Sequence, residues 1–294
     1  MSSKVLLINP PFYRLLGSHY NANSLGIAYI ASYLNEHGHD AWVYNADYLE
    51  EKEYRNLKNL FDGFSDYQKY FSNHDDPIWN EVVEKISDFA PEWVGYTSYT
   101  ANVTAIDIIS RKLKAEKALI KQVIGGVHAT LDNSVLNHLP AIDYSVQREG
   151  EEAMLSLIEG EKPESISGVV SRNSSGLCDN GDASVIKNID ELPYPERRKF
   201  WGIDKKNHHT VDVSYICTIR GCPYRCNYCA SPFHWKRDKT QYRSPHSVIQ
   251  EMKYLKKNFW DQNKEYDYSA SANIGKKQSL KIKDNSIVYF ADDV

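Results

Sequence analysis

The sequence lacks any long hydrophobic run and any marked excess of one charge. No stretch of about 18 apolar residues occurs, which argues against a transmembrane helix. The formal net charge of −4 over 294 residues indicates neither nucleic acid nor an anionic membrane as the main partner. The apolar run at residues 5–8 is too short for a signal peptide and stops at Asn9-Pro10-Pro11. We therefore expect a cytoplasmic globular protein.

Two common nucleotide-binding motifs are also missing. No Gly-x-Gly-x-x-Gly follows the first apolar run, and no phosphate-binding P-loop is present. An alternating pattern of strands and helices in this chain therefore does not indicate a nicotinamide or nucleoside-triphosphate site.

Cysteine is scarce but clustered. The chain has five cysteines, an odd number, and four of them lie between Cys217 and Cys229. A secreted disulfide framework would spread its cysteines along a shorter chain. The clustering instead favours metal ligands or redox groups in a reducing compartment.

Short apolar runs alternate with helical stretches from residue 4 to residue 158. The pattern predicts strands at residues 5–9, 41–45, 93–98, 122–126 and 144–147, and helices at 25–37, 103–117 and 151–158. Such alternation predicts parallel crossovers and a doubly wound, Rossmann-like α/β sheet. We expect the flavodoxin-like strand order 2-1-3-4-5, with ligands at the carboxyl ends of the strands.

Composition divides the chain into residues 1–160, 161–205 and 206–294. The middle part is a polar linker in which residues 168–172 and 183–187 are expected to form a small hairpin. Within the first part, residues 48–80 interrupt the alternation. Two interpretations of this excursion stay open: helices packed on the sheet, or a cap over a ligand pocket.

The third part begins like a βαβ unit. Strands are expected at residues 212–217 and 287–290, with a helix at 247–258 that starts after Ser244-Pro245. The second strand ends close to Val294 without neighbours to cover it, so we expect the sequence to be a fragment or one piece of a split protein.

The loop between these elements carries three thiols within eight residues. Cys222, Cys226 and Cys229 have the spacing Cys-x3-Cys-x2-Cys. Such a loop can curl around an iron–sulfur cubane and give three irons one sulfur each. The fourth iron then stays open to a substrate or cofactor, as the open position of a catalytic zinc site does.

Other interpretations of these cysteines remain. Cys226 and Cys229 alone could form a thioredoxin-like dithiol, although that motif does not need Cys222. A zinc site could take a fourth ligand from His234 or Cys217. Cys217, inside an expected strand, is typical of a packed core thiol, and the isolated Cys178 is assigned nothing.

The cysteine loop resembles the signature of the radical S-adenosylmethionine (radical SAM) superfamily, Cys-x3-Cys-x-aromatic-Cys, with Tyr228 as the aromatic residue. The wider match, Arg220-Gly221-Cys222-Pro223, Ser231-Pro232 and Tyr242-Arg243-Ser244-Pro245, is similar to the branch that carries cobalamin domains. This resemblance implies a 4Fe-4S cluster, S-adenosylmethionine on the open iron, and a TIM-type barrel of which residues 206–294 are the first part. It also implies that Asp292 and Asp293 contact S-adenosylmethionine; a solvated acidic turn is the alternative.

Polar residues and glycines follow the expected strands of the first part. We select Asn9 and Pro10, Ser98 and Thr100, Gly125, Gly126 and His128, and Glu149 and Gly150 as candidate binding residues. Taken alone, these residues are more often explained by plain structural turns. In order along the chain, however, Asn-Pro-Pro, residues 25–31, Gly-Gly-x-His-Ala-Thr and Glu-Gly-Glu-Glu resemble the cobalamin domain of the same radical SAM branch.

One feature of other cobalamin proteins is absent. The sequence has no Asp-x-His-x-x-Gly motif, which supplies a histidine to cobalt, because His39 and Asp40 stand in the wrong order. The resemblance therefore implies base-off cobalamin without a protein histidine ligand. We expect His128 to lie near the edge of the cofactor.

The resemblance implies an enzyme that cleaves S-adenosylmethionine reductively to a 5′-deoxyadenosyl radical. Methyl transfer to an unactivated carbon is the leading hypothesis. Ring closure or rearrangement, as in anaerobic tetrapyrrole cyclases, and a non-catalytic iron–sulfur or cobalamin-binding fragment are the alternatives. The expected partners are a small-molecule substrate and an electron donor such as flavodoxin or ferredoxin, with no nucleic acid and no membrane span.

Substitution in the cysteine loop separates the two cofactors. Cys229→Ser should abolish cluster binding, because it removes one of the three thiolates, while leaving cobalamin on the N-terminal sheet. A bulky residue at Gly126 should do the reverse. Iron and cobalamin contents of the purified variants check both expectations; cobalamin retained in the Gly126 variant contradicts the placement of the pocket.

Overall fold

The computed structural model describes residues 2–18, 24–48, 61, 63–203, 215–224, 226–231 and 240–259, and the backbone of three short strands at 266–267, 281–282 and 289–290. Within this part of the chain, no helix combines the length and the apolar character that a membrane crossing needs.

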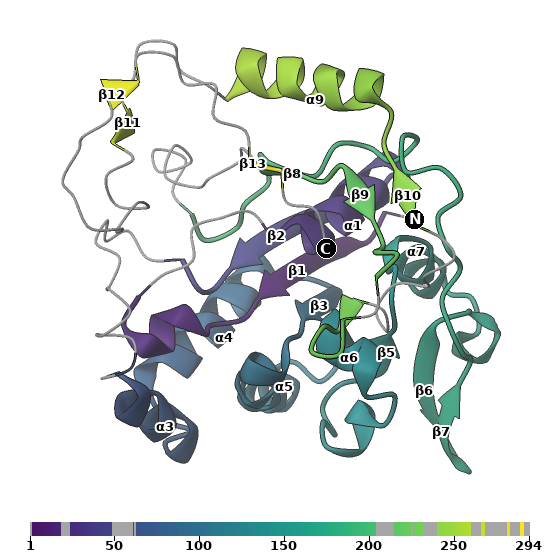
Figure 1. The fold of residues 1–294 in the computed structure, drawn as a ribbon. Coiled ribbons are helices and arrows are strands. Elements are labelled where there is room, and N and C mark those ends of the chain that lie inside the picture. The colour runs from purple at the N-terminus through teal and green to yellow at the C-terminus, as the bar shows by residue number, and fades with distance from the viewer. Residues whose placement is uncertain are drawn as a thin grey trace.

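A seven-stranded sheet forms the centre of the molecule (Figure 1). Its order is β2-β1-β3-β4-β5-β6-β7, and the first five strands pair in parallel. These five are β1 (Lys4–Asn9), β2 (Asp40–Asn45), β3 (Trp93–Thr97), β4 (Lys121–Gly125) and β5 (Tyr144–Val146). The predicted order 2-1-3-4-5 is confirmed, and each strand boundary lies within one residue of its expected position.

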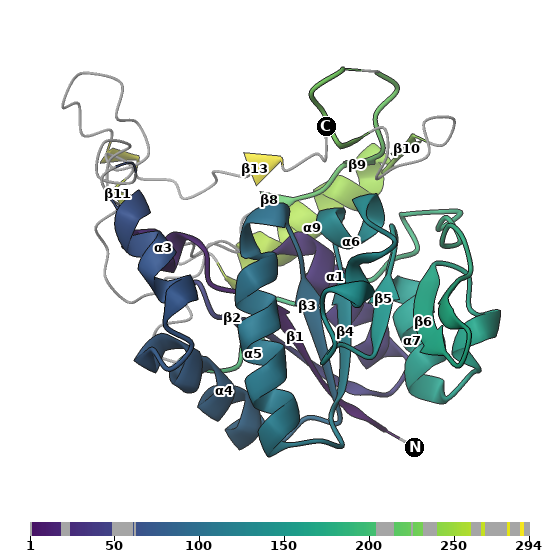
Figure 2. The same cartoon turned by 90° about the horizontal axis from the view of Figure 1, so that it is seen from below.

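Helices cover both faces of this sheet (Figure 2). They are α1 (Leu25–Glu36), α3 (Phe64–Ser72), α4 (Pro77–Phe89), α5 (Val103–Glu116), α6 (Val127–Leu131) and α7 (Glu151–Glu159), with short 3-10 turns η1 (Tyr13–Leu16), η2 (Thr100–Asn102), η3 (Val135–Asn137) and η4 (Pro163–Ser165). Because side chains alternate along a strand, Leu6 and Ile8 of β1 pack with α4 and α5, whereas Val5 and Leu7 pack with α1 and α7.

The sheet continues into an antiparallel hairpin. The strands β6 (Val169–Asn173) and β7 (Gly176–Asp179) pair with each other, and β6 also pairs with β5. The expected second strand at residues 183–187 is wrong, because the chain turns earlier. The side chain of Asn173 accepts a hydrogen bond from the backbone N–H of Ser175 at 2.8 Å, which closes a two-residue turn.

The segment that follows the hairpin is bonded to the sheet domain along its length, including α1 and β2. Glu196 donates its backbone N–H to the carbonyl of Ala28 in α1 at 2.9 Å. Further on, the backbone N–H of Val43 in β2 donates to the carbonyl of Lys199 at 2.9 Å, and the N–H of Trp201 donates to the carbonyl of Val43 at 2.7 Å. These two hydrogen bonds lie on either side of Phe200. The polar linker predicted from composition is therefore fixed along α1 and the outer edge of β2.

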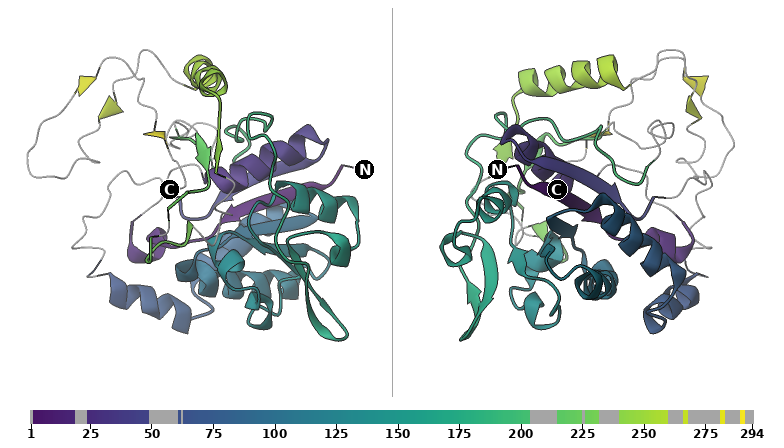
Figure 3. Two further views of the ribbon diagram at one scale, coloured as in Figure 1. Left: turned by 45° about the vertical axis from the view of Figure 1, so that its right-hand side comes forward. Right: turned by 180° about the vertical axis from the view of Figure 1, so that it is seen from behind.

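The last part of the chain contains paired strands and one long helix. The strand β8 (Tyr215–Ile216) pairs in parallel with β13 (Tyr289–Phe290), and β11 (Tyr266–Asp267) pairs antiparallel with β12 (Lys281–Ile282). The helix α9 (Pro245–Asn258) lies beyond α1, as Figures 1 and 3 show from different sides. The strands β8 and β13 with the helix α9 between them agree with the expected βαβ unit. The described strands do not close a barrel, so the barrel stays a prediction.

The predicted start signal of α9 is confirmed, although the helix begins two residues earlier than expected, at Pro245. The hydroxyl oxygen of Ser244 accepts a hydrogen bond from the backbone N–H of Ser247 at 3.1 Å, and Pro245 occupies the first turn. This combination satisfies one free N–H group of the helix end and presets the first backbone angle.

A fully buried ion-pair network fastens α9 to the rest of the protein. The carboxylate of Glu251 pairs with Arg197 at 2.5 Å and, through its other oxygen, with Arg243. Arg197 also donates to the carbonyl of Tyr215 at 2.8 Å, and Arg243 to that of Cys217 at 3.1 Å. The carboxylate of Glu251 thus joins α9 to Arg197 of the linker, and Arg197 in turn bonds to β8.

Replacement of Glu251 should destabilise the protein strongly. Glu251→Ala leaves two buried guanidinium groups without their carboxylate, which costs about 3–5 kcal/mol. Urea unfolding followed by circular dichroism measures the change, and Glu116→Ala, at the exposed end of α5, is the control. Equal unfolding midpoints for the two variants would contradict this role of Glu251.

Candidate functional site: a pocket shared by the strand ends and the cysteine loop

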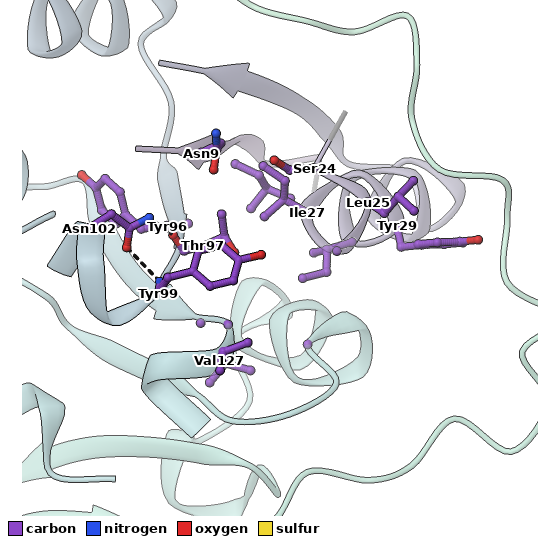
Figure 4. Close-up of a pocket in the computed structure, with 18 of the residues that line it drawn as sticks. Asn9, Ser24, Leu25, Ile27, Tyr29, Tyr96, Thr97, Tyr99, Asn102 and Val127 are labelled. Atoms are coloured by element: carbon purple, nitrogen blue, oxygen red, sulfur yellow. Dashed lines mark hydrogen bonds between the residues drawn. The ribbon is translucent and has the colours of Figure 1, made fainter. Parts of the chain in front are cut away.

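A pocket of about 670 Å³ lies at the carboxyl ends of β1, β3, β4 and β5 (Figure 4). Its wall is formed by strand-end loops, by the first turns of α1 and by the cysteine loop, including Asn9 and Pro10, residues 24–27, Thr97 and Tyr99, residues 125–127, residues 148–151, Cys217, Arg220 and residues 229–231. Parallel strands end at one edge, which is why residues so far apart in sequence meet there.

The loop after β1 is held in place by a buried carboxylate. Asp47, which follows β2, accepts hydrogen bonds from three successive backbone N–H groups, those of residues 12, 13 and 14, at 2.8, 3.1 and 2.7 Å. Burial raises the pKa of Asp47, against the opposite effect of these bonds. Beside it, the amide of Asn9 donates to the side-chain oxygen of Asn45 at 2.9 Å. This side of the pocket is therefore fixed by the ends of β1 and β2.

The glycine pair after β4 allows two strand ends to approach closely. Gly126 has φ +94°, and a Cβ atom there would lie 2.8 Å from the backbone nitrogen of Ser98. The hydroxyl of Ser98 donates to the carbonyl of Gly125 at 2.6 Å and accepts from the N–H of Ala129 at 3.3 Å. Glycine is thus required by the backbone contact between β3 and β4.

The structure brings only some of the predicted binding residues to the pocket. The residues that line it are Asn9, Pro10, Gly125, Gly126, Glu149 and Gly150. Ser98 is fully buried, and its hydroxyl is used within the protein, so it supports the loops. Thr100 and His128 lie outside the lining, where the Thr100 hydroxyl is 3.1 Å from Nδ1 of His128. A direct contact of Thr100 or His128 with a cofactor stays a prediction.

Tyr99 is a lining residue that the sequence analysis passed over. Its side chain is 55% exposed, and Figure 4 shows the ring among the labelled lining residues, between Ile27 and Val127. The backbone N–H of Tyr99 donates to the side-chain oxygen of Asn102 at 2.8 Å. Its position two residues after the end of β3 is the sequence signal that points to it.

The described part of the 48–80 excursion supports the rim of the pocket. Tyr67 of α3 contacts the ring of Phe12 at 5.9 Å and donates its hydroxyl to the carbonyl of Ala101 at 2.7 Å. Phe12 and Ala101 line the pocket, whereas no residue of α3 does. The helix α4 meanwhile packs on the sheet. Residues 49–60 and 62 lie outside the described part of the chain.

The cysteine loop closes the pocket from the side opposite the sheet. Its base is a short antiparallel ladder between β9 (Ile219–Arg220) and β10 (Gln241–Tyr242). Cys222 is buried, Cys226 is exposed, and Cys229 is half-buried and lines the pocket. The thiol of Cys229 accepts from the N–H of Ser231 at 3.4 Å.

The described residues contain no group of three His, Cys, Asp or Glu side chains converging on a single metal ion. A cubane does not require such convergence, because each thiolate binds a different iron. Cluster ligation by Cys222, Cys226 and Cys229 stays a prediction.

Tyr228 is 93% exposed. Asp292, Asp293 and His234 lie outside the described residues.

Arg220 links the cysteine loop to the loop after β5. Its guanidinium pairs with Glu149 at 2.8 Å and with Glu151 at 2.6 Å, and it lies 5.0 Å from the ring centroid of Tyr29. Burial alone would lower the pKa of Arg220, but the two carboxylates raise it above its usual range. The predicted site residue Glu149 therefore uses its carboxylate inside the protein.

Comparison with known proteins identifies this arrangement. Residues 16–158 match the family model of the B12 binding domain. The chain is 25% identical over 261 residues to an uncharacterized methyltransferase of Pyrococcus horikoshii, covering 86% of this chain and 50% of that protein. It is 28% identical over 233 residues to the anaerobic magnesium-protoporphyrin IX monomethyl ester cyclase of Rubrivivax gelatinosus, covering 74% and 39%.

A solved structure shows the same fold. The radical S-adenosylmethionine methyltransferase TsrM of Kitasatospora setae, with cobalamin and a [4Fe-4S] cluster bound, superposes with a TM-score of 0.59 at 18% identity, covering 87% of this chain and 46% of that one. Residues 16–158 of this chain thus match the B12 binding domain family, and most of the chain is distantly similar to proteins named as a methyltransferase and as anaerobic cyclases. The chain spans half or less of the length of each of these relatives.

The pocket has features that fit a bulky cofactor. Gly26, in the first turn of α1, lines it, and a Cβ atom at this position would meet nothing within 4 Å. The space beside Gly26 is therefore open to a ligand, unlike the crowded space beside Gly126. At the other wall, the buried hydroxyl of Ser231 has no hydrogen-bond partner among the described residues. No histidine of the described chain lines the pocket.

Gly26 gives a cleaner test of the pocket than Gly126, where a larger residue would collide with backbone. Gly26→Trp should lower cobalamin content after reconstitution by about tenfold or more, because an indole would occupy ligand space without disturbing packed neighbours. Absorption of the extracted cofactor measures this content. Leu119→Trp, at a 93% exposed position before β4, is the control and should keep its cobalamin. Full cobalamin content in Gly26→Trp would place the ligand elsewhere.

Proposed function

We propose that the protein is a cobalamin-dependent radical SAM enzyme. In this proposal, cobalamin occupies the pocket at the strand ends, and Cys222, Cys226 and Cys229 hold a 4Fe-4S cluster with one open iron. The observation that supports this most strongly is that one cavity is lined both by the B12-binding domain and by Cys229, Ala230 and Ser231. In this proposal, both cofactor sites open onto a single space.

When bound, the two groups supply reductive cleavage of S-adenosylmethionine to a 5′-deoxyadenosyl radical and a transferable methyl group. The chain's own residues hold and orient these groups and exclude water. Gly26 leaves room for the cofactor beside α1, and the Asp47 carboxylate fixes the loop after β1. The buried hydroxyl of Ser231, which lacks a hydrogen-bond partner among the described residues, lies beside the cluster loop.

Methyl transfer to an unactivated carbon is the favoured reaction. One relative that matches 86% of this chain is named as a methyltransferase, although one cyclase matches the same share, and a solved structure with the same fold is of a methyltransferase. Ring closure is the second candidate, since several relatives are named as cyclases. Cobalamin in this proposal is base-off without a histidine ligand, and the partners are a small-molecule substrate and a flavodoxin- or ferredoxin-type electron donor.

A non-catalytic module is the alternative from another class. It would bind a cluster or cobalamin without activating S-adenosylmethionine. The two proposals differ in one product, 5′-deoxyadenosine, which forms only when the sulfonium is cleaved.

The anaerobically reconstituted and reduced protein should release 5′-deoxyadenosine from S-adenosylmethionine. Liquid chromatography with mass detection measures the product. Cys222→Ala should reduce it to the background without protein, because the cluster loses a ligand. Product equal in both proteins, or absent from a wild-type sample that contains iron and cobalamin, would favour the non-catalytic module.

A further inference from the structure

Arg220 occupies a special position between the two proposed cofactor sites. It is the last residue of β9, and only Gly221 separates it from Cys222. Its side chain turns back to the sheet domain, where it is 8% exposed and pairs with Glu149 and Glu151, whose side chains are 4% and 3% exposed. The cysteine loop is therefore tied to the domain at its first ligand.

The acceptors of Arg220 are themselves fixed. Glu149 follows Arg148, whose backbone is in the left-handed region with φ 62°. The second carboxylate oxygen of Glu149 accepts from the backbone N–H of Ile186 at 2.8 Å. Glu151 is the first residue of α7. A non-glycine residue held at positive φ costs free energy, and here it turns the chain so that both carboxylates reach one guanidinium.

Attachment of the last part of the chain does not depend on this contact alone. Arg197, Glu251 and Arg243 form a separate buried network that joins the linker, β8 and α9. None of these three residues lines the pocket, whereas Arg220, Glu149 and Glu151 all do. The network of Arg197, Glu251 and Arg243 therefore joins the parts away from the pocket, whereas the ion pairs of Arg220 lie in the pocket wall itself.

We propose that Arg220 is a positioning residue that fixes the distance and orientation of the cluster loop relative to the cobalamin-binding strand ends. The inference rests on the proposed function. A planar, bidentate guanidinium bound to two buried carboxylates restricts both position and angle, which a lysine cannot do. Reactions between two held groups are steeply sensitive to such placement, and a displacement of about 1 Å can lower the rate about 100-fold.

The test measures the separation of the two cofactors directly. Pulsed electron paramagnetic resonance on frozen samples, with cobalamin as Co(II) and the cluster reduced by one electron, reports their dipolar coupling. Wild-type protein should give one narrow distance distribution. Arg220→Gln should keep iron and cobalamin but give a broadened or shifted distribution, and 5′-deoxyadenosine formation should fall about 100-fold. Arg220→Lys should give a distance distribution whose width lies between those of the wild type and Arg220→Gln.

Two further variants keep this test decisive. Arg111→Gln removes a surface ion pair to Asp107, and it should leave the distribution unchanged. If Arg220→Gln fails to fold because two buried carboxylates are left facing each other, the variant R220M/E149Q/E151Q removes the charges together. This triple variant should fold, bind both cofactors and still show the broadened distribution.

The outcomes separate the two proposals. A narrow, unshifted distribution in Arg220→Gln, or in the triple variant, overturns the positioning role and leaves the proposed function intact. Wild-type protein that takes up no cluster or no cobalamin overturns both.

Discussion

The buried ion pairs between Arg220 and the carboxylates of Glu149 and Glu151 are the contact on which the site depends. They join β9, at the entrance of the cysteine loop, to the loop after β5. Burying three charges gains little net stability, because desolvation offsets most of the attraction, yet breaking such a group is costly. The physical effect is therefore placement: the cysteine loop lies over the strand ends and closes one pocket with them.

The sheet supplies the other half of this geometry. Five parallel strands direct their loops to one edge, and each loop is fixed there by a different device. Asp47 holds the loop after β1 through backbone N–H groups, and Gly126 lets the ends of β3 and β4 approach. Asn102 orients Tyr99. The pocket is thus built from rigid elements, while Gly26 leaves the space beside α1 open to a ligand.

Local signals in the sequence predicted the parallel sheet well. Apolar periodicity located its five strands to within one residue, and the cysteine spacing pointed to the loop that lines the pocket. The second hairpin strand was predicted too late in the chain, because the two-residue turn after Asn173 lets residues 176–179 pair with β6 at once. Arg220 and Glu149 are 71 residues apart, so no local pattern could pair them. Ser98 looked available beside a strand end, but its burial depends on the tertiary contact with Gly125.

The proposed radical chemistry requires a cluster in which one iron has no protein ligand. Mössbauer spectroscopy of protein reconstituted with iron-57 tests this most directly, because it distinguishes irons with different ligands. The account predicts a cubane in which one iron changes its spectrum when S-adenosylmethionine is added, while the three irons bound by Cys222, Cys226 and Cys229 keep theirs. A cubane with four equivalent thiolate-bound irons, unchanged by S-adenosylmethionine, would contradict it.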